Sequence, residues 1–184
     1  MSVLVTIDHP WNGSFNYVIL QAALRGLESA GHSVDLLDLQ AENFNPVLST
    51  AELEVYHTGK YLDPKIGEYQ RRVVAAEHLV FIFPVWWEVM PARLKGWFDR
   101  VFLPEWAFAE ADAAPLLTHI RTGTAITTMG GNIGITIMEK VGENFPGLLI
   151  LDHRSGRDLD DAILAFFAVH VFTLTASAPF RLEM

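Results

Sequence analysis

The sequence predicts an α/β fold in which a doubly wound sheet of five parallel strands carries helices on both faces. The unbroken apolar runs at residues 3–7 ("VLVTI") and 78–83 ("HLVFIF") are typical of parallel strands that are buried on both sides. Segments with apolar residues at helical spacing lie between the expected strands. Strands that alternate with helices indicate parallel pairing, with helices packed on both faces of the sheet.

Each element is justified by its spacing and by the residues at its ends. The helix expected at 15–31 ends at Gly31, because glycine is typical of helix ends, and the helix at 91–102 begins at Pro91. Residues 40–50 are expected to be irregular, and a polar, tyrosine-rich stretch continues to about Gly67. In chain order the expected elements are a strand at 3–7, a helix at 15–31, strands at 33–39 and 78–83 on either side of a helix at 64–76, a helix at 91–102, a strand at 122–129, helices at 133–141 and 158–167, and a fifth strand at 170–175.

Length and composition predict a single globular domain over residues 1–184. Hydrophobic residues make up 51% and charged residues 19% of the chain. The formal charge of -9 has no long acidic block, and an acidic chain of this kind is not expected to bind nucleic acid. The absence of cysteine excludes disulfides, thiolate nucleophiles and iron–sulfur clusters.

The location of the protein is expected to be cytoplasmic. The first residues lack a basic segment followed by an apolar one, so no secretory signal is recognised. The apolar segment 162–178 is short for a membrane span and contains His170, so we interpret it as core. No histidine cluster has the spacing of metal ligands, and no metal is expected.

Three polar or aromatic segments follow expected strands, and parallel sheets bind ligands at the carboxyl ends of their strands. They are "DHPWNGSFN" at 8–16, "PVWWEVMP" at 84–91 and "TTMGGN" at 127–132. We therefore expect these segments to converge on one site.

The first segment is open to two interpretations. Ser14 occupies the N-cap position of the expected helix, and the N–H groups of Phe15 and Asn16, with His9 nearby, can bind an anion. A plain capped helix would have the same residues, and this segment alone does not separate the alternatives.

The second segment contains two consecutive tryptophans, Trp86 and Trp87. Neighbouring residues of an extended chain point to opposite sides, so both rings cannot enter one core face. At the edge of a parallel sheet such a pair favours contact with a planar aromatic ligand over packing. On the helix that follows, we expect Arg93, Lys95 and Arg100 to form a solvated face rather than to bind a 2′-phosphate, and Asp99 to form an ion pair on that helix.

The combination of "HPWNGSFN", "NFNPVLS", "FPVWWEVMPARLKGWFDRVF" and "TTMGG" resembles the flavodoxin-like NAD(P)H dehydrogenase (quinone) family. This family includes DT-diaphorase, bacterial modulators of drug activity and the ancillary subunits of potassium-efflux systems. The resemblance runs in order from about residue 3 to residue 131. It implies a flavodoxin-like fold, and from about residue 144 the chain is atypical of the family.

The resemblance also implies a bound flavin, with FMN slightly favoured over FAD, and the residues that hold it. The phosphate and ribityl chain would contact His9, Ser14, Phe15 and Asn16. The edge of the isoalloxazine ring would contact Pro84, Val85, Trp86 and Trp87, and its pyrimidine side would contact Thr127, Thr128, Gly130 and Gly131. Trp86, Trp87, Gly130 and Gly131 would stack the ring and the substrate and act as the catalytic residues.

The implied reaction is a two-electron, ping-pong hydride transfer from NAD(P)H through the flavin to a quinone or another small electrophile. The family implies a homodimer, and we expect the segment 44–69 to make the contact between subunits. The same motifs serve a second function, a flavin-binding regulatory subunit of a membrane potassium-efflux transporter. Some family members have a tyrosine and a histidine after the glycine pair, whereas this chain has "NIGITIMEK" there.

Overall fold

The structure is a computed structural model, and it describes residues 1–87, 89–128 and 149–151. The strands among these residues form one parallel sheet with the order β2-β1-β3-β4-β5. The strands are β1 (Ser2–Ile7), β2 (Ser33–Asp38), β3 (His78–Pro84), β4 (Thr122–Thr128) and β5 (Leu149–Leu151). The order reverses between β1 and β3, which is the arrangement that creates a ligand crevice in doubly wound sheets.

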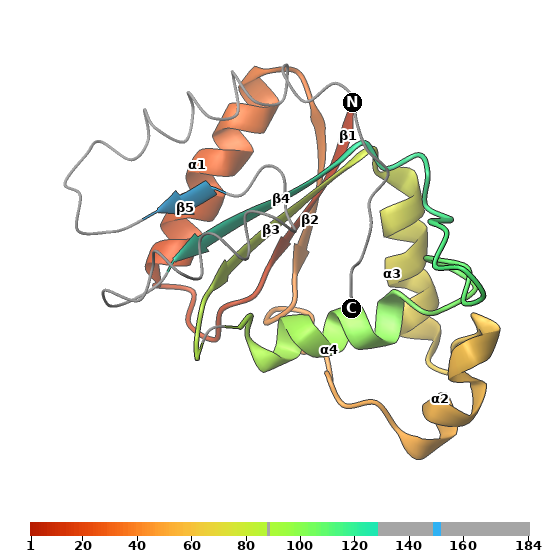
Figure 1. Cartoon of the computed structure of the whole chain (residues 1–184). Helices are drawn as coiled ribbons and strands as arrows, with labels where there is room; N and C mark the ends of the chain where they lie inside the picture. The colour runs from red at the N-terminus through yellow and green to blue at the C-terminus, as the bar shows by residue number, and fades with distance from the viewer. Residues whose placement is uncertain (88, 129–148, 152–184) are drawn as a thin grey trace.

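Helices cover both faces of the sheet, as Figure 1 shows with α1 on one side and α3 and α4 on the other. The helices are α1 (Phe15–Ser29), α2 (Thr50–Val55), α3 (Pro64–Ala75) and α4 (Ala92–Val101), and a 3-10 turn spans Tyr56–Thr58. The chain turns after α1 at Gly31, whose positive φ of 78° explains the glycine expected there. The predicted α/β fold is confirmed.

Alternate residues of the strands enter two separate cores. On the α1 side, Val3, Val5 and Ile7 of β1 pack with Val80 and Ile82 of β3. Because side chains alternate between the faces of a strand, the residues between them enter the opposite core. The two central strands are therefore apolar on both faces, which explains their unbroken hydrophobic runs.

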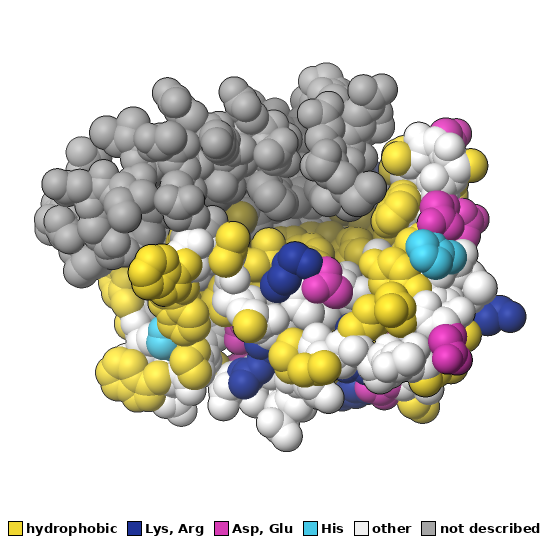
Figure 2. Space-filling view, turned by 60° about the horizontal axis from the view of Figure 1, so that its bottom comes forward, with side chains coloured by type: hydrophobic (Ala, Val, Ile, Leu, Met, Phe, Trp, Pro, Cys, Tyr) yellow, Lys and Arg dark blue, Asp and Glu magenta, His cyan; other side chains and the backbone are white. Residues whose placement is uncertain are grey.

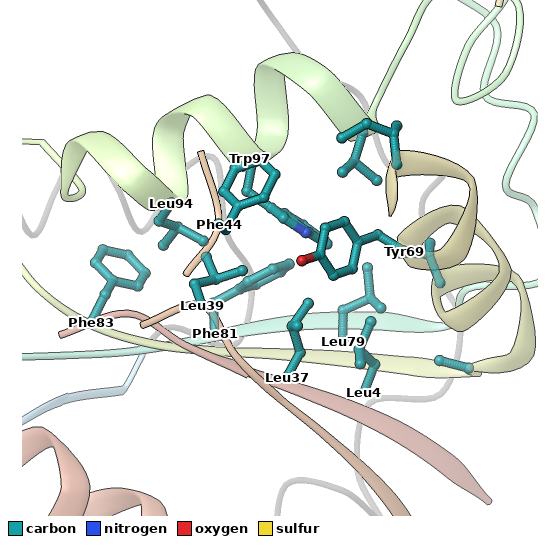
Figure 3. Close-up of a cluster of buried hydrophobic side chains, with 14 of the residues drawn as sticks. Leu4, Leu37, Leu39, Phe44, Tyr69, Leu79, Phe81, Phe83, Leu94 and Trp97 are labelled. Carbon is teal, nitrogen blue, oxygen red and sulfur yellow. The ribbon is translucent and has the colours of Figure 1, made fainter. Parts of the chain in front are cut away.

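The core on the other face contains a cluster of aromatic rings between the sheet and helices α3 and α4 (Figure 3). Trp97 of α4 lies at its centre and is fully buried. Its ring makes edge-to-face contacts with Tyr69, Phe81, Phe98 and Phe102, at centroid distances of 5.4–6.4 Å. Offset and edge-to-face pairs of this kind add stability beyond the burial of their area.

The segment between β2 and α3 folds against α4. A Cβ atom at Gly96 would lie 2.2 Å from the carbonyl oxygen of Pro46, so only glycine lets the two backbones approach this closely. We expected no regular structure here, but α2 begins after Ser49, whose side chain forms a capping box with Glu52. The pattern of serine followed three residues later by glutamate was the sequence signal that we missed.

The strand next to β4 is β5 at Leu149–Leu151, a segment where we expected no strand. Residues 133–141, 158–167 and 170–175 lie outside the described residues. The single domain over 1–184 stays a prediction. In the part of the chain that the structure describes, no helix has the length and apolar character needed to cross a bilayer.

Candidate functional site

The segments that follow β1, β3 and β4 meet at the carboxyl edge of the sheet, as their topology predicts. The N–H of Asp8 donates to the carbonyl oxygen of Ile82 at 3.0 Å, which carries the pairing of β1 with β3 one residue beyond β1. Beyond β3, the N–H of Val85 donates to the carbonyl oxygen of Thr128 at 2.7 Å. Pro84 pairs in register with Thr128 at the last position of the two strands. These backbone contacts fix the starting points of the three segments.

The first turn of α1 opens toward this edge. Ser14 is the N-cap and has extended backbone angles, but its side chain makes no capping hydrogen bond. The first N–H groups of a helix have no acceptor within the helix, which leaves those of Phe15 and Asn16 available to another group. The positive end of the helix dipole adds to their attraction for an anion. The geometry of this turn therefore allows an anion to bind there. The hydroxyl of Ser14 is not used to cap the helix.

Three buried polar atoms, two in this turn and one at the end of β4 on the opposite face of the sheet, have no hydrogen-bond partner among the described residues. They are the Oγ of Ser14, the Nδ2 of Asn16 and the Oγ1 of Thr127. Asn16 is held by its other amide atom, because the Thr128 hydroxyl donates to its Oδ1 at 2.7 Å. Buried polar groups are almost always paired, so the two unpaired atoms of Ser14 and Asn16 in one helical turn indicate a place for a polar ligand.

The segment after β3 forms a closed turn that projects a tryptophan. Trp86 and Val89 exchange backbone hydrogen bonds of 3.0 and 3.2 Å. Between them, Trp87 has a positive φ of 52° and a side chain that is 97% exposed. A bulky residue in the left-handed region is strained, and such strain is often retained at functional sites. The two tryptophans point away from the core, as expected.

The loop after β1 and the turn after β3 touch through aromatic rings. The ring centroids of His9 and Trp86 are 5.9 Å apart, with an angle of 60° between the planes. The N–H of Trp11 lies 3.1 Å from the Nδ1 of His9, which holds the imidazole against its own loop. The half-buried His9 therefore links the loop after β1 to the tryptophan turn.

Asp8 is a second link between these segments, and its role was missed in the sequence. Its side chain is 2% exposed, and its Oδ2 accepts the N–H of Leu94 in α4 at 2.9 Å. Burial raises the pKa of Asp8, and the Leu94 hydrogen bond and the Arg93 guanidinium offset only part of that increase. The contact joins residues 86 positions apart, so no local sequence signal reveals it.

The predicted roles of the basic residues on α4 have different outcomes. Lys95 pairs with Asp99 on the exposed side of the helix, as expected. Arg100 does not belong to a solvated face, because its side chain is 6% exposed and binds Glu52, Asp63 and the carbonyl oxygen of Asn45. The prediction for Arg100 was wrong because the segment between β2 and α3 folds over it.

The chain belongs to a family described as Flavodoxin-like fold, which it matches over residues 1–137. Among curated proteins it is 33% identical over 147 residues to NAD(P)H dehydrogenase (quinone) 1 of Rattus norvegicus. That alignment covers 69% of this chain and 53% of the rat protein. The chain thus spans about half the length of the curated relatives it matches.

Solved structures resemble this one over nearly the whole chain. An NAD(P)H:quinone oxidoreductase from Methanothermobacter marburgensis is 26% identical with a TM-score of 0.77, covering 95% of this chain and 99% of its own. An FMN-dependent NADH-azoreductase from Bacillus anthracis, solved with FMN, has a TM-score of 0.64. The azoreductase is 16% identical and covers 91% of this chain and 95% of its own, which is evidence for the fold alone.

Gly130 and Gly131 lie outside the described residues, so the structure does not position the glycine pair of the third segment. The remaining expected residues lie along the carboxyl edge. His9, Ser14, Phe15 and Asn16 lie in the loop after β1 and the first turn of α1. Pro84, Val85, Trp86 and Trp87 lie at the end of β3 and in the turn beyond it, and Thr127 and Thr128 end β4.

Proposed function

We propose that this protein is a flavin-dependent NAD(P)H:quinone oxidoreductase that acts on quinones or other small electrophiles. The observation that carries the proposal is the pair of unpartnered polar atoms of Ser14 and Asn16 in the first turn of α1, at the carboxyl edge. They lie where a doubly wound sheet binds its ligand. The similarity to quinone-reducing dehydrogenases supplies the class of ligand and substrate.

The first turn of α1 would hold the phosphate end of the flavin. The N–H groups of Phe15 and Asn16 and the hydroxyl of Ser14 supply donors without a negatively charged side chain in that turn. The Nδ2 of Asn16 would bind oxygens of the ribityl chain, and the hydroxyl of Thr127 would face the pyrimidine side of the ring. His9 would close the outer side of this part of the site.

The turn after β3 would hold the ring system. Backbone groups of Val85 and Trp86 would face the ring edge, and the exposed indole of Trp87 would cover a bound substrate. A bound flavin supplies the exchange of a hydride between a nicotinamide and a quinone. The protein would contribute the stacking surface and the exclusion of water. We favour FMN slightly over FAD, and the choice between NADH and NADPH stays open.

The purified protein offers a direct test. We expect a flavin absorbance band, or binding of added FMN or FAD, that is bleached by anaerobic NADH or NADPH and restored by a quinone. A protein that binds neither flavin would contradict the proposal. A bound flavin that neither nicotinamide reduces would instead favour the alternative, a regulatory subunit of a potassium-efflux transporter.

A substitution at Ser14 tests the phosphate position without disturbing the helix. Aspartate is a good N-cap, so Ser14→Asp should keep the stability of α1 while its charge repels a phosphate. We expect FMN to bind at least about 10-fold more weakly, measured by quenching of flavin fluorescence. Gln21→Glu places the same charge on an exposed position of α1 and serves as the control. Equal FMN affinity in both variants would remove Ser14 from the site.

The expected homodimer is also a proposal. The segment 44–69, where we expected the contact between subunits, exposes Val47, Leu53, Tyr61 and Leu62. The two loops of the candidate site also expose Trp11, Trp86, Trp87 and Val89. Figure 2 shows exposed hydrophobic side chains close together on the face turned toward the viewer. Apolar surface of this kind is typical of an interaction site, and a measurement of molar mass in solution tests whether a second copy covers it.

A further inference from the structure

Helix α4 begins without a capping side chain of its own. Its N-cap residue is Pro91, which makes no side-chain hydrogen bond to the first turn. The acceptor for the N–H of Leu94, the third helical residue, is the carboxylate of Asp8 at 2.9 Å. A carboxylate at this end of a helix also interacts favourably with the helix dipole. Asp8 therefore performs for α4 the task that an N-cap side chain usually performs.

The same carboxylate faces a cation and belongs to a chain of contacts around the edge of the sheet. Its Oδ1 lies 3.7 Å from the Nη1 of Arg93, and that guanidinium also donates to Gln40. The N–H of Gln40 donates to Asp38 at 3.0 Å, and the hydroxyl of Tyr17 in α1 donates to Asp38 at 2.7 Å. These contacts thus connect the first turn of α4 with Tyr17 in the first turn of α1.

The short connection before α4 makes this anchoring important for the tryptophan turn. Only Met90 and Pro91 separate the turn closed by Trp86 and Val89 from the first residue of α4. The position of the helix start therefore determines where the turn can lie. On the other side, His9 is the next residue after Asp8, and its ring contacts Trp86.

We propose that Asp8 is a positioning residue, which holds the tryptophan turn at a fixed place relative to the first turn of α1 by accepting the N–H of Leu94. This inference rests on the proposed function, because the two turns would hold the ring and the phosphate of one flavin. Asp8 itself would not touch the flavin. Asp8 would affect binding of the isoalloxazine ring by fixing the start of α4. This effect would be the same for a flavin with or without a phosphate.

Two variants at this position separate the hydrogen bond from the charge. Asp8→Ala removes the acceptor, whereas Asp8→Asn keeps an oxygen that can accept the Leu94 N–H. We expect Asp8→Ala to bind both FMN and riboflavin about 10-fold more weakly, because riboflavin shares the ring but lacks the phosphate. Asp8→Asn should stay within about 3-fold of the wild type for both. Asp99→Ala, an exposed position of α4, is the control and should change neither affinity.

Three results would overturn the inference. The first is wild-type affinity for both flavins in Asp8→Ala. The second is a loss confined to FMN, which would restrict Asp8 to the phosphate end. The third is an equal loss in Asp8→Asn and Asp8→Ala, which would show that the acceptor oxygen does not carry the effect.

Failure of the proposed function is recognised separately, because the wild-type protein would then bind neither FMN nor FAD. The positioning role is then decided by amide hydrogen exchange in residues 84–94 of the flavin-free protein. Faster exchange in Asp8→Ala than in Asp8→Asn and the wild type supports it, and equal exchange in all three overturns it.

If Asp8→Ala does not fold, Arg93→Met replaces it as the test. This variant keeps the Leu94 hydrogen bond but removes the cation beside a buried carboxylate. Because Arg93→Met keeps the acceptor for the Leu94 N–H, we expect its affinity for riboflavin to stay within about 3-fold of the wild type. A loss of about 10-fold would assign the effect to the Arg93 ion pair and overturn the inference.

Discussion

Trp87 and Trp97 lie ten positions apart in one continuous motif, and their surroundings are opposite. Trp97 is fully buried among aromatic rings in the core beneath α4. Trp87 is 97% exposed, on a strained backbone at the carboxyl edge of the sheet. Trp97 belongs to a region where aromatic rings stabilise the fold. Trp87 belongs to a region where the side chain is left in solvent and the backbone is strained. The difference indicates which part of the motif serves stability and which part serves binding.

The comparison is tested most strongly by replacing each tryptophan with alanine. Trp97→Ala should lower the free energy of unfolding by about 3–5 kcal/mol, because it removes a large buried ring and leaves a cavity. Trp87→Ala should change it by less than about 0.5 kcal/mol, because the side chain is exposed. Urea denaturation of both variants measures the difference. A similar loss in the two would mean that the Trp87 ring is buried in solution.

The next largest effect is expected at Arg100, which fastens the segment between β2 and α3 to α4. Arg100→Met should cost about 2 kcal/mol, since it leaves Glu52 without its cation in a mostly buried position. Lys95→Met removes an exposed ion pair on the same helix and should cost less than about 0.5 kcal/mol. The two are compared by thermal unfolding, and equal melting temperatures would show that the Arg100 contacts contribute no stability.

A smaller change in stability is expected where the sheet meets the proposed ligand. Thr127→Val removes a buried hydroxyl with no partner among the described residues, so the free energy of unfolding should change by less than about 1 kcal/mol. We expect the affinity for FMN to fall several-fold. Thr122→Val, at the other end of β4, removes a hydroxyl that lies 2.8 Å from the Nδ1 of His78. This control should cost about 1 kcal/mol and leave FMN affinity unchanged. A loss of FMN affinity in Thr122→Val but not in Thr127→Val would contradict the division into a region for stability and a region for binding.

The smallest expected effect is a pH dependence at the amino end of the sheet. Burial lowers the pKa of His32 and of His78, so each favours the folded state while it is neutral. Their contribution is complete above the unfolded-state pKa of about 6.5 and is lost as the pH falls through the folded-state values. His32→Leu should therefore flatten the fall in urea midpoint between pH 7.5 and pH 5. An unchanged slope would indicate that His32 is charged in the folded protein.

Most of the fold could be predicted because its signals are local. The apolar runs of β1 and β3 and the spacing of α1 and α4 are properties of short segments. The strand β5 was missed because three residues are too few for a recognisable pattern. Helix α2 had a local signal in Ser49 and Glu52 that we did not use.

The site could be predicted only in part. The positions of Ser14 and the paired tryptophans follow from the strand ends that precede them, because parallel strands end at one edge. The links of Asp8 to Leu94 and of Arg100 to Glu52 join residues 86 and 48 positions apart. Contacts at such separations arise from packing of the whole chain, and one sequence contains no local trace of them. Whether the residues bind a flavin stays a prediction.

The close approach of Gly96 to Pro46 restricts how this protein can be recombined with its relatives. Position 96 admits no side chain while the backbone at Pro46 stays in place, and Arg100 reaches Asn45 one turn further along the helix. A chimera whose crossover falls between residues 46 and 96 would combine one parent's segment with the other parent's helix. Such hybrids should fold less often than hybrids with crossovers elsewhere. A library of chimeras should therefore take these two segments from the same parent.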